Sequence, residues 1–148
     1  MRRIYASVLG FLATAFFLRV LGQALVAFFG VTFLPPMDQW YSGLLPYGVL
    51  LPIQILILVL QAKISLDIWH GTGRFARRWP MAGRALCWFS YAYFLAMVVR
   101  YVLTMYLYPE RRWFSGTIPL FFHWVLAAYL FVLGRYHLSA AREASPPA

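Results

Sequence analysis

One stretch of the sequence, residues 39–62, decides the fold: QWYSGLLPYGVLLPIQILILVLQA. It contains no charged side chain, and a helix rising about 1.5 Å per residue over most of it would cross the roughly 30 Å hydrocarbon layer of a bilayer. Three further apolar runs of comparable length lie on either side of it. The sequence therefore predicts four transmembrane helices, over residues 4–32, 43–62, 85–108 and 116–134.

The composition supports the same fold class. Hydrophobic residues make up 63% of the 148-residue chain and charged residues 11%, whereas soluble domains average about half and about a quarter. A chain this short does not bury so much apolar surface in a core of its own, which excludes a water-soluble domain. We predict an all-α, polytopic membrane protein with one domain over residues 1–140, built as two tandem helical hairpins, and a short disordered tail over residues 141–148.

The charged residues predict how the chain is oriented. The net charge is +9, but the basic residues lie mainly between the apolar runs and form no basic face with interleaved aromatic residues, which argues against nucleic acid as a partner. The predicted loop over residues 63–84 and the two ends of the chain carry nine basic residues, against two, Arg111 and Arg112, on the opposite side. Both termini are therefore expected in the cytoplasm, and the composition favours the inner membrane of a bacterium. The first apolar run exceeds the core of a signal peptide, so we expect it to remain in the mature protein.

An internal repeat relates the two turns on the side opposite the basic loop. The pattern Pro-x3-Trp-aromatic-Ser-Gly-x-aliphatic-Pro occurs twice, 73 residues apart. We interpret it as a helix-start motif, in which Trp anchors at the membrane interface, Ser caps the first amides and Pro fits the opening turn. The alternative is that the two elements jointly frame a site at the outer surface. The matching residues are Trp40, Ser42, Gly43 and Pro46 in the first copy and Trp113, Ser115, Gly116 and Pro119 in the second.

Each predicted helix carries a polar residue deep in the membrane, where ionisable groups are candidates for function. At about 1.5 Å per residue, one level lies roughly 10–16 Å below the outer boundary and a second roughly 22–24 Å below it. The first level holds Gln23, Gln54, Arg100 and His123, and the second holds Arg19 and Gln61. We expect these six residues to form one interior cluster, with Tyr93, Tyr101 and Thr104 as supplements.

Two interpretations of this cluster remain open. No carboxylate lies at that depth, so the two arginines require carbonyl oxygens, lipid phosphates or a bound anion. An anionic lipid head group or a quinone carbonyl would satisfy them. The alternative is a structural clamp of hydrogen bonds between helices, each contributing about 0.6–2 kcal/mol.

Catalytic and cofactor motifs do not emerge from the sequence. There is no phosphate-binding loop, no nucleophile elbow and no pair of acidic residues at helical spacing, so we expect no catalytic residue and favour a protein that is not an enzyme. Metal binding at Cys87 has no supporting ligand spacing. Haem ligation by His123 is disfavoured because His70 and His137 lie near the opposite boundary.

Three functional hypotheses follow, in order of preference. The first is a non-catalytic accessory or structural subunit of a larger membrane complex, whose partners are other membrane proteins or a second copy of the chain. The second is a membrane-embedded binding protein or carrier for an anionic lipid, a quinone or a similar amphiphile, acting through the Arg/Gln cluster. The third is a haem-binding redox protein that uses His123.

Overall fold

The computed structural model describes residues 1–40, 45–107 and 118–143, the last four of these by their backbone alone. Within them the regular structure is entirely helical, as the sequence predicts, and comprises α1 (Arg2–Phe29), α2 (Met37–Trp40), α3 (Tyr47–His70), α4 (Pro80–Leu107) and α5 (Ile118–Glu143). All but the short α2 are long and apolar enough to cross a membrane. The predicted all-α fold with four membrane-spanning helices is confirmed.

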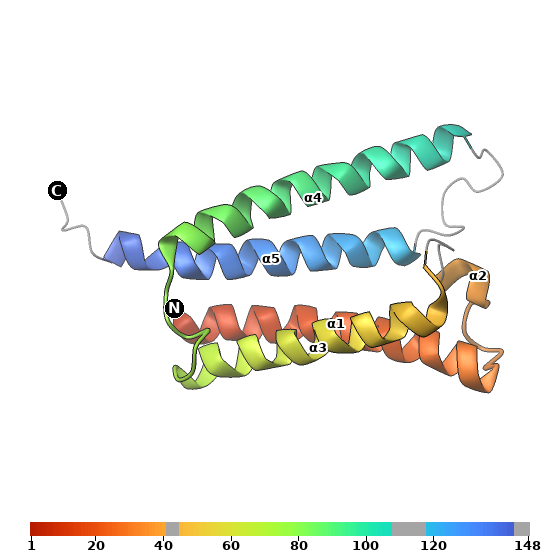
Figure 1. Cartoon of the computed structure of the whole chain (residues 1–148), viewed down its shortest axis with the longest axis horizontal. Coiled ribbons are helices and arrows are strands. Elements are labelled where there is room, and N and C mark those ends of the chain that lie inside the picture. The colour runs from red at the N-terminus through yellow and green to blue at the C-terminus, as the bar shows by residue number, and fades with distance from the viewer. Residues whose placement is uncertain (41–44, 108–117, 144–148) are drawn as a thin grey trace.

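The four long helices form two hairpins that meet in the middle of the molecule. α1 packs along α3, α4 packs along α5, and α1 also packs along α5, so the helices follow one another in the order α3, α1, α5, α4 (Figure 1). In the described chain, α3 and α4 do not pack directly on one another. The start of α1 and the end of α5 lie at the same end of the helices, beside the loop between α3 and α4 (Figure 1).

The second helix extends well beyond the apolar run that predicted it. α3 continues past residue 62 to His70, so the loop predicted over residues 63–84 is confined to residues 71–79. Lys63 Nζ lies 2.7 Å from Asp67 Oδ1 one turn later, and such a pair supports a helix. Gly71 then ends the helix in the left-handed region, with φ of 75°. A charged residue indicates where a helix leaves the hydrocarbon layer. The helix itself can continue beyond that point, as α3 does.

The other boundaries also differ from those predicted. α1 starts at Arg2 rather than residue 4. It ends at Phe29 rather than residue 32, because Gly30 adopts a left-handed conformation with φ of 59°. α4 starts at Pro80 rather than residue 85, since proline suits a first helical turn. α5 continues past residue 134 to Glu143, so residues 141–143 of the expected tail are helical in their backbone. α3 starts at Tyr47 rather than residue 43, because Pro46 stands at its N-cap and the described residues 45 and 46 are not helical. Residues 144–148 and the boundaries predicted near 108 and 116 lie outside the described residues.

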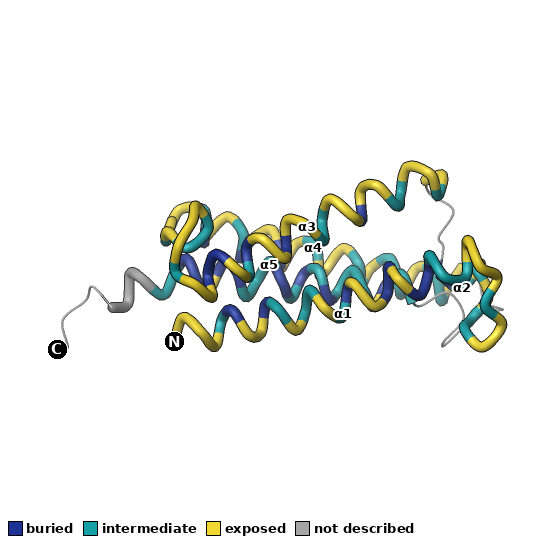
Figure 2. The backbone as a smooth tube through the Cα atoms, turned by 90° about the horizontal axis from the view of Figure 1, so that it is seen from below, coloured by how far each residue is buried: buried dark blue, intermediate teal, exposed yellow. Residues whose placement is uncertain are grey.

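The main apolar core lies at the end of the bundle where α1 begins. Its buried residues come from three helices: Ala6 and Leu9 of α1, Ile64 and Ile68 of α3, and Tyr129, Leu133 and Tyr136 of α5. Buried positions follow the facing sides of α1 and α5 along much of their length (Figure 2). This core therefore joins the two hairpins.

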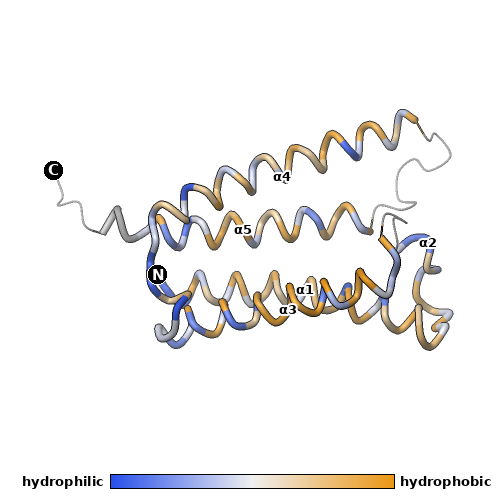
Figure 3. Tube along the Cα trace, viewed as in Figure 1, coloured by the Kyte–Doolittle hydropathy of each residue, from blue (hydrophilic) through white to orange (hydrophobic). Residues whose placement is uncertain are grey.

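The outer surfaces of the long helices are apolar, as lipid contact requires. Hydrophobic residues occupy the middle of these helices, and hydrophilic residues gather near the start of α1 and around the loop between α3 and α4 (Figure 3). α4 is the most exposed of the four spans, with large side chains such as Trp88 and Tyr106 about three-quarters exposed or more. Such surfaces are unfavourable in water and ordinary in a bilayer.

Candidate functional site

Three of the predicted polar residues meet in the interior of the bundle. Arg19 and Gln23 lie one turn apart on α1, and both donate to the main-chain carbonyl oxygen of Trp40, over 3.1 Å from Arg19 Nη2 and 3.5 Å from Gln23 Nε2. Gln54 Nε2 of α3 donates to Gln23 Oε1 over 3.3 Å. All three side chains are buried, with 7% of Arg19 and 4% of Gln54 exposed. The hydrogen bonds therefore join α1, α2 and α3 through one buried polar chain.

Trp40 reaches this position because the residue opposite its indole is a glycine. A Cβ atom added at Gly22 would lie 2.7 Å from Cη2 of Trp40, so the ring packs directly on the α1 backbone. Its Nε1 donates to the carbonyl oxygen of Pro35 over 2.8 Å. The indole is buried within the protein, unlike the interfacial anchor expected from the repeat. Gly22, placed between Arg19 and Gln23, is the sequence signal that could have indicated this packing.

The remaining residues of the repeat are described only in part. Pro46 immediately precedes α3 and Pro119 is the second residue of α5, so both prolines lie where a helix begins, as the repeat predicts. Ser42, Gly43, Trp113, Ser115 and Gly116 lie outside the described residues.

A cavity of about 210 Å³ lies beside the buried polar chain. Its lining is mostly apolar and comes from α1, α2, α3, α4 and α5. The polar side chains that line it are Arg19, Gln54, Tyr93 and His123. The cavity thus collects polar groups from all four spanning helices, which is the convergence expected from their depths. We call it the Arg19 cavity.

Tyr93 and His123 form the wall of the Arg19 cavity that α4 and α5 contribute. The Tyr93 hydroxyl lies 2.5 Å from Nδ1 of His123, and the two rings meet edge to face with centroids 5.8 Å apart. The other two histidines lie near the loop between α3 and α4. His70 Nδ1 contacts the Leu66 carbonyl oxygen over 2.9 Å, and His137 Nδ1 accepts the Trp79 N–H over 3.3 Å. The three imidazoles therefore have separate environments.

Two of the six predicted cluster residues, Arg100 and Gln61, neither line the Arg19 cavity nor belong to the buried polar chain. Arg100 is half-buried on α4 and is absent from the cavity lining, although it lies seven residues from Tyr93 on the same face. Gln61 is buried nearer the apolar core, where its main-chain carbonyl oxygen accepts a hydrogen bond from the Tyr129 hydroxyl over 3.0 Å. The structure thus gathers Arg19, Gln23, Gln54 and His123 in or beside the cavity, whereas Arg100 and Gln61 do not line it.

The Arg19 cavity contains polar atoms that have no partner among the described residues. Nε of Arg19 and Oε1 of Gln54 are both buried without a hydrogen bond. The ion pair present in the described part of the chain joins Lys63 to Asp67, so no described carboxylate offsets the Arg19 charge. Burying a charged group without a counter-charge costs several kcal/mol. The arrangement offers a ligand one cationic donor and one amide acceptor in an apolar enclosure.

Comparison of the chain with protein-family models, with curated proteins and with solved structures found no match. Function is therefore inferred from the chemistry of the Arg19 cavity.

Proposed function

We propose that this protein binds, within the membrane, the anionic head group of an amphiphile, a carboxylate or a phosphate, in the Arg19 cavity. The observation that carries the proposal is the environment of Arg19, which is 7% exposed, bonded to one main-chain carbonyl and left with an unpaired Nε atom. A carboxylate or phosphate accepts such donors and supplies the missing negative charge. The protein then acts as a membrane-embedded binding protein or carrier.

The charge of Arg19 favours an anion over a neutral quinone. A quinone carbonyl would accept the free N–H of Arg19 but would leave the guanidinium charge uncompensated in a medium of low dielectric constant. The unpaired Oε1 of Gln54 suits a hydroxyl group of a glycerol head group. The charge of Arg19 therefore fits a fatty-acid carboxylate or a phospholipid better than a quinone, and the Gln54 acceptor fits the phospholipid.

The size of the Arg19 cavity fits a head group and not a whole amphiphile. Its volume of about 210 Å³ is below the roughly 300–1,000 Å³ of pockets that enclose drug-sized ligands. An acyl chain would leave the cavity along the aliphatic side chains that line it, such as Ile57 of α3 and Leu126 of α5.

A charge-matched pair of variants tests the proposal. Arg19→Gln removes the cationic donor from the cavity, and Arg100→Gln removes an equal charge from a half-buried position outside the cavity lining. Each protein is purified in mild detergent, offered palmitate, phosphatidylglycerol or ubiquinone in separate arms, and assayed for retained ligand by mass spectrometry. We expect Arg19→Gln to reduce retention of palmitate at least tenfold, or to lower retained phosphatidylglycerol by one molecule per protein, since a charge-assisted hydrogen bond contributes about 1.5–3 kcal/mol.

Arg100→Gln is expected to retain ligand within about twofold of the unmodified protein, because it leaves every described donor of the Arg19 cavity in place. Whether palmitate or phosphatidylglycerol responds identifies the source of the anionic group. The proposal would be refuted if Arg19→Gln and the unmodified protein retained equal amounts of the anionic ligands. It would also be refuted if both proteins retained ubiquinone in preference to them.

An accessory subunit remains the second candidate function. The observation that favours it is the exposure of α4, which packs along α5 alone among the described helices and presents Trp88, Phe94 and Tyr106 outward. Extraction in mild detergent followed by measurement of particle mass tests this role. The mass of a monomer or a small homo-oligomer would contradict it.

A further inference from the structure

A second cavity, of about 340 Å³, is enclosed by α3, α4 and α5 beside the loop over residues 71–79. Its walls are aliphatic and come from α3, α4 and α5, which provide Leu60, Ile64, Leu86, Leu130 and Leu133. Its rim is formed by the loop between α3 and α4, through Arg74, Phe75, Arg77 and Trp79. We call this the loop cavity. It combines an apolar interior with a basic rim at the end of the molecule where hydrophilic residues gather (Figure 3).

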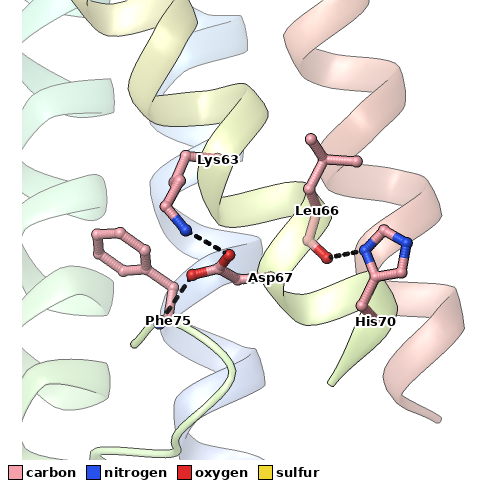
Figure 4. A network of polar contacts seen from close by, with 5 residues as sticks. All are labelled: Lys63, Leu66, Asp67, His70 and Phe75. Carbon is pink, nitrogen blue, oxygen red and sulfur yellow. Dashed lines mark hydrogen bonds and ion pairs between the residues drawn. The ribbon is translucent and has the colours of Figure 1, made fainter. Parts of the chain in front are cut away.

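The loop that carries the two arginines is fixed by α3 on one side. Asp67 accepts one hydrogen bond from the Lys63 ammonium group over 2.7 Å and another from the main-chain N–H of Phe75 over 3.4 Å (Figure 4). Its carboxylate also lies so close to Gly73 that a Cβ atom there would be 2.4 Å from Oδ2, and Gly73 has a φ of 87°. The loop therefore folds back over the end of α3.

The same loop is fixed by α5 on the other side. The Tyr136 hydroxyl donates to the Ala76 carbonyl oxygen over 2.7 Å, and the Trp79 N–H donates to Nδ1 of His137 over 3.3 Å. Hydrogen bonds thus hold the backbone on both sides of Arg77. Arg74 and Arg77 belong to a loop whose backbone is already held in place, which reduces the entropy lost when they bind a ligand.

The electrostatics of the rim favour an anion. Arg74 and Arg77 are both exposed, and the carboxylate nearest to them along the chain, Asp67, is paired with Lys63. The Arg77 guanidinium lies 6.0 Å from the ring centroid of Trp79, a residue type that gathers at the level of lipid head groups. His137 lines the cavity, and because its Nδ1 accepts a hydrogen bond, the neutral ring carries its proton on Nε2.

We propose that the loop cavity binds one anionic phospholipid from the adjacent leaflet, with its phosphate between Arg74 and Arg77 and an acyl chain among the aliphatic side chains. Charge complementarity selects the occupant, because basic pockets between transmembrane helices attract anionic head groups and an apolar interior accepts only the acyl part. The site shares no residue with the Arg19 cavity and does not depend on the function proposed for it.

A double substitution with a matched control tests this site. The protein is reconstituted into nanodiscs made of equal parts phosphatidylglycerol and phosphatidylcholine, extracted into mild detergent, and analysed by mass spectrometry for the ratio of the two lipids retained. Both double variants are made in an Arg19→Gln background, so that the Arg19 cavity contributes no anion binding. Arg74→Gln with Arg77→Gln should lower the enrichment of phosphatidylglycerol at least tenfold, since each arginine offers a charge-assisted hydrogen bond to the bound phosphate. Arg84→Gln with Arg135→Gln removes the same charge at two exposed positions outside the cavity lining, so the bound phosphate loses no direct partner and the enrichment should stay within about twofold.

A third variant tests the acyl part of the site. Leu86→Trp places a larger side chain in the cavity wall and should reduce retention of phosphatidylglycerol while leaving the ligand of the Arg19 cavity in place. Equal loss in the two double variants would overturn the proposal, because charge in general would then explain the enrichment. It would also be overturned if the unmodified protein retained the two lipids equally, or if a neutral lipid or a quinone occupied the cavity regardless of Arg74 and Arg77.

Discussion

Arg19 is the buried arginine of the described chain, and its surroundings explain how a bilayer tolerates it. The guanidinium bonds to a main-chain carbonyl that α2 brings into the interior, in the way that irregular backbone is accepted at depth when it lies within protein. Gln23 shares the same carbonyl and Gln54 extends the network. The polar residues of α1 and α3 therefore depend on the position of Trp40.

The contact between Gly22 and Trp40 gives a prediction at the scale of the residue. Gly22→Ala places a Cβ atom 2.7 Å from Cη2 of Trp40, so the indole must move and shift the carbonyl that Arg19 binds. We expect a loss of about 1–3 kcal/mol in stability, as overpacking usually causes, measured by thermal unfolding in detergent. Gly10→Ala on the same helix is the control, because its Cβ atom would meet nothing within 4 Å, and it should leave stability unchanged or raise it by up to about 1 kcal/mol.

A loss of stability as large in Gly10→Ala as in Gly22→Ala would contradict this explanation, since both substitutions change helix propensity equally. Retention of palmitate or phosphatidylglycerol provides a second readout. It should fall in Gly22→Ala and persist in Gly10→Ala, because only the former disturbs Trp40.

At the scale of the element, the sequence predicted the existence of the long helices better than their ends. Apolar runs mark the part of a helix that lies in hydrocarbon, and the runs ending at residues 62 and 134 located α3 and α5 correctly. Charged residues such as Lys63 and Asp67 extend a helix beyond the membrane when they pair one turn apart, so charge alone is a poor sign of a boundary. In the structure, Gly30 and Gly71 mark the ends of α1 and α3, because they adopt positive φ values that few other residues accept.

The loop over residues 71–79 provides a prediction for that element. Asp67→Asn weakens the acceptor that holds Lys63 and the Phe75 N–H, so the amides of the loop should exchange with solvent at least tenfold faster, as measured by hydrogen–deuterium exchange with mass spectrometry. Lys63→Gln is the partner control, since it removes the ion pair but keeps the carboxylate that accepts the Phe75 N–H. A faster exchange in Lys63→Gln than in Asp67→Asn would show that the ion pair, and not the carboxylate, fixes the loop.

The sequence predicted the depth of the candidate site in the membrane, but not which residues would form it. Counting residues along each helix placed polar groups of four helices at similar levels, and four of the six meet in or beside the Arg19 cavity. Arg100 and Gln61 could not be excluded by depth, because depth does not fix the direction of a side chain around the helix axis. The Trp40 carbonyl was missed because a main-chain acceptor has no signature in the sequence.

At the scale of the whole molecule, the start of α1, the end of α5 and the loop between α3 and α4 lie at one end (Figure 1). The nine basic residues that the sequence assigns to this side predict that it faces the cytoplasm. Cysteine labelling measures this orientation directly. The single native cysteine, Cys87, is buried and serves as an internal blank.

Two exposed positions at opposite ends of the bundle give the test. Thr72→Cys in the loop between α3 and α4 should react with a membrane-impermeant maleimide only after the cytoplasmic side is opened, whereas Phe33→Cys between α1 and α2 should react in intact cells. The unmodified chain should remain unlabelled because Cys87 is 8% exposed. The reverse pattern would place the basic end outside and contradict the charge rule for this protein.

The order α3, α1, α5, α4 also bears on how the protein is made. During synthesis the first hairpin leaves the translocation machinery before the second has been translated, so α1 and α3 meet while α5 is still absent. Both cavities take walls from each hairpin, and neither is complete until α1 and α5 have found one another in the bilayer. The proposed ligands can therefore bind only after the two hairpins have joined, because a newly inserted chain whose halves are still apart lacks both cavities.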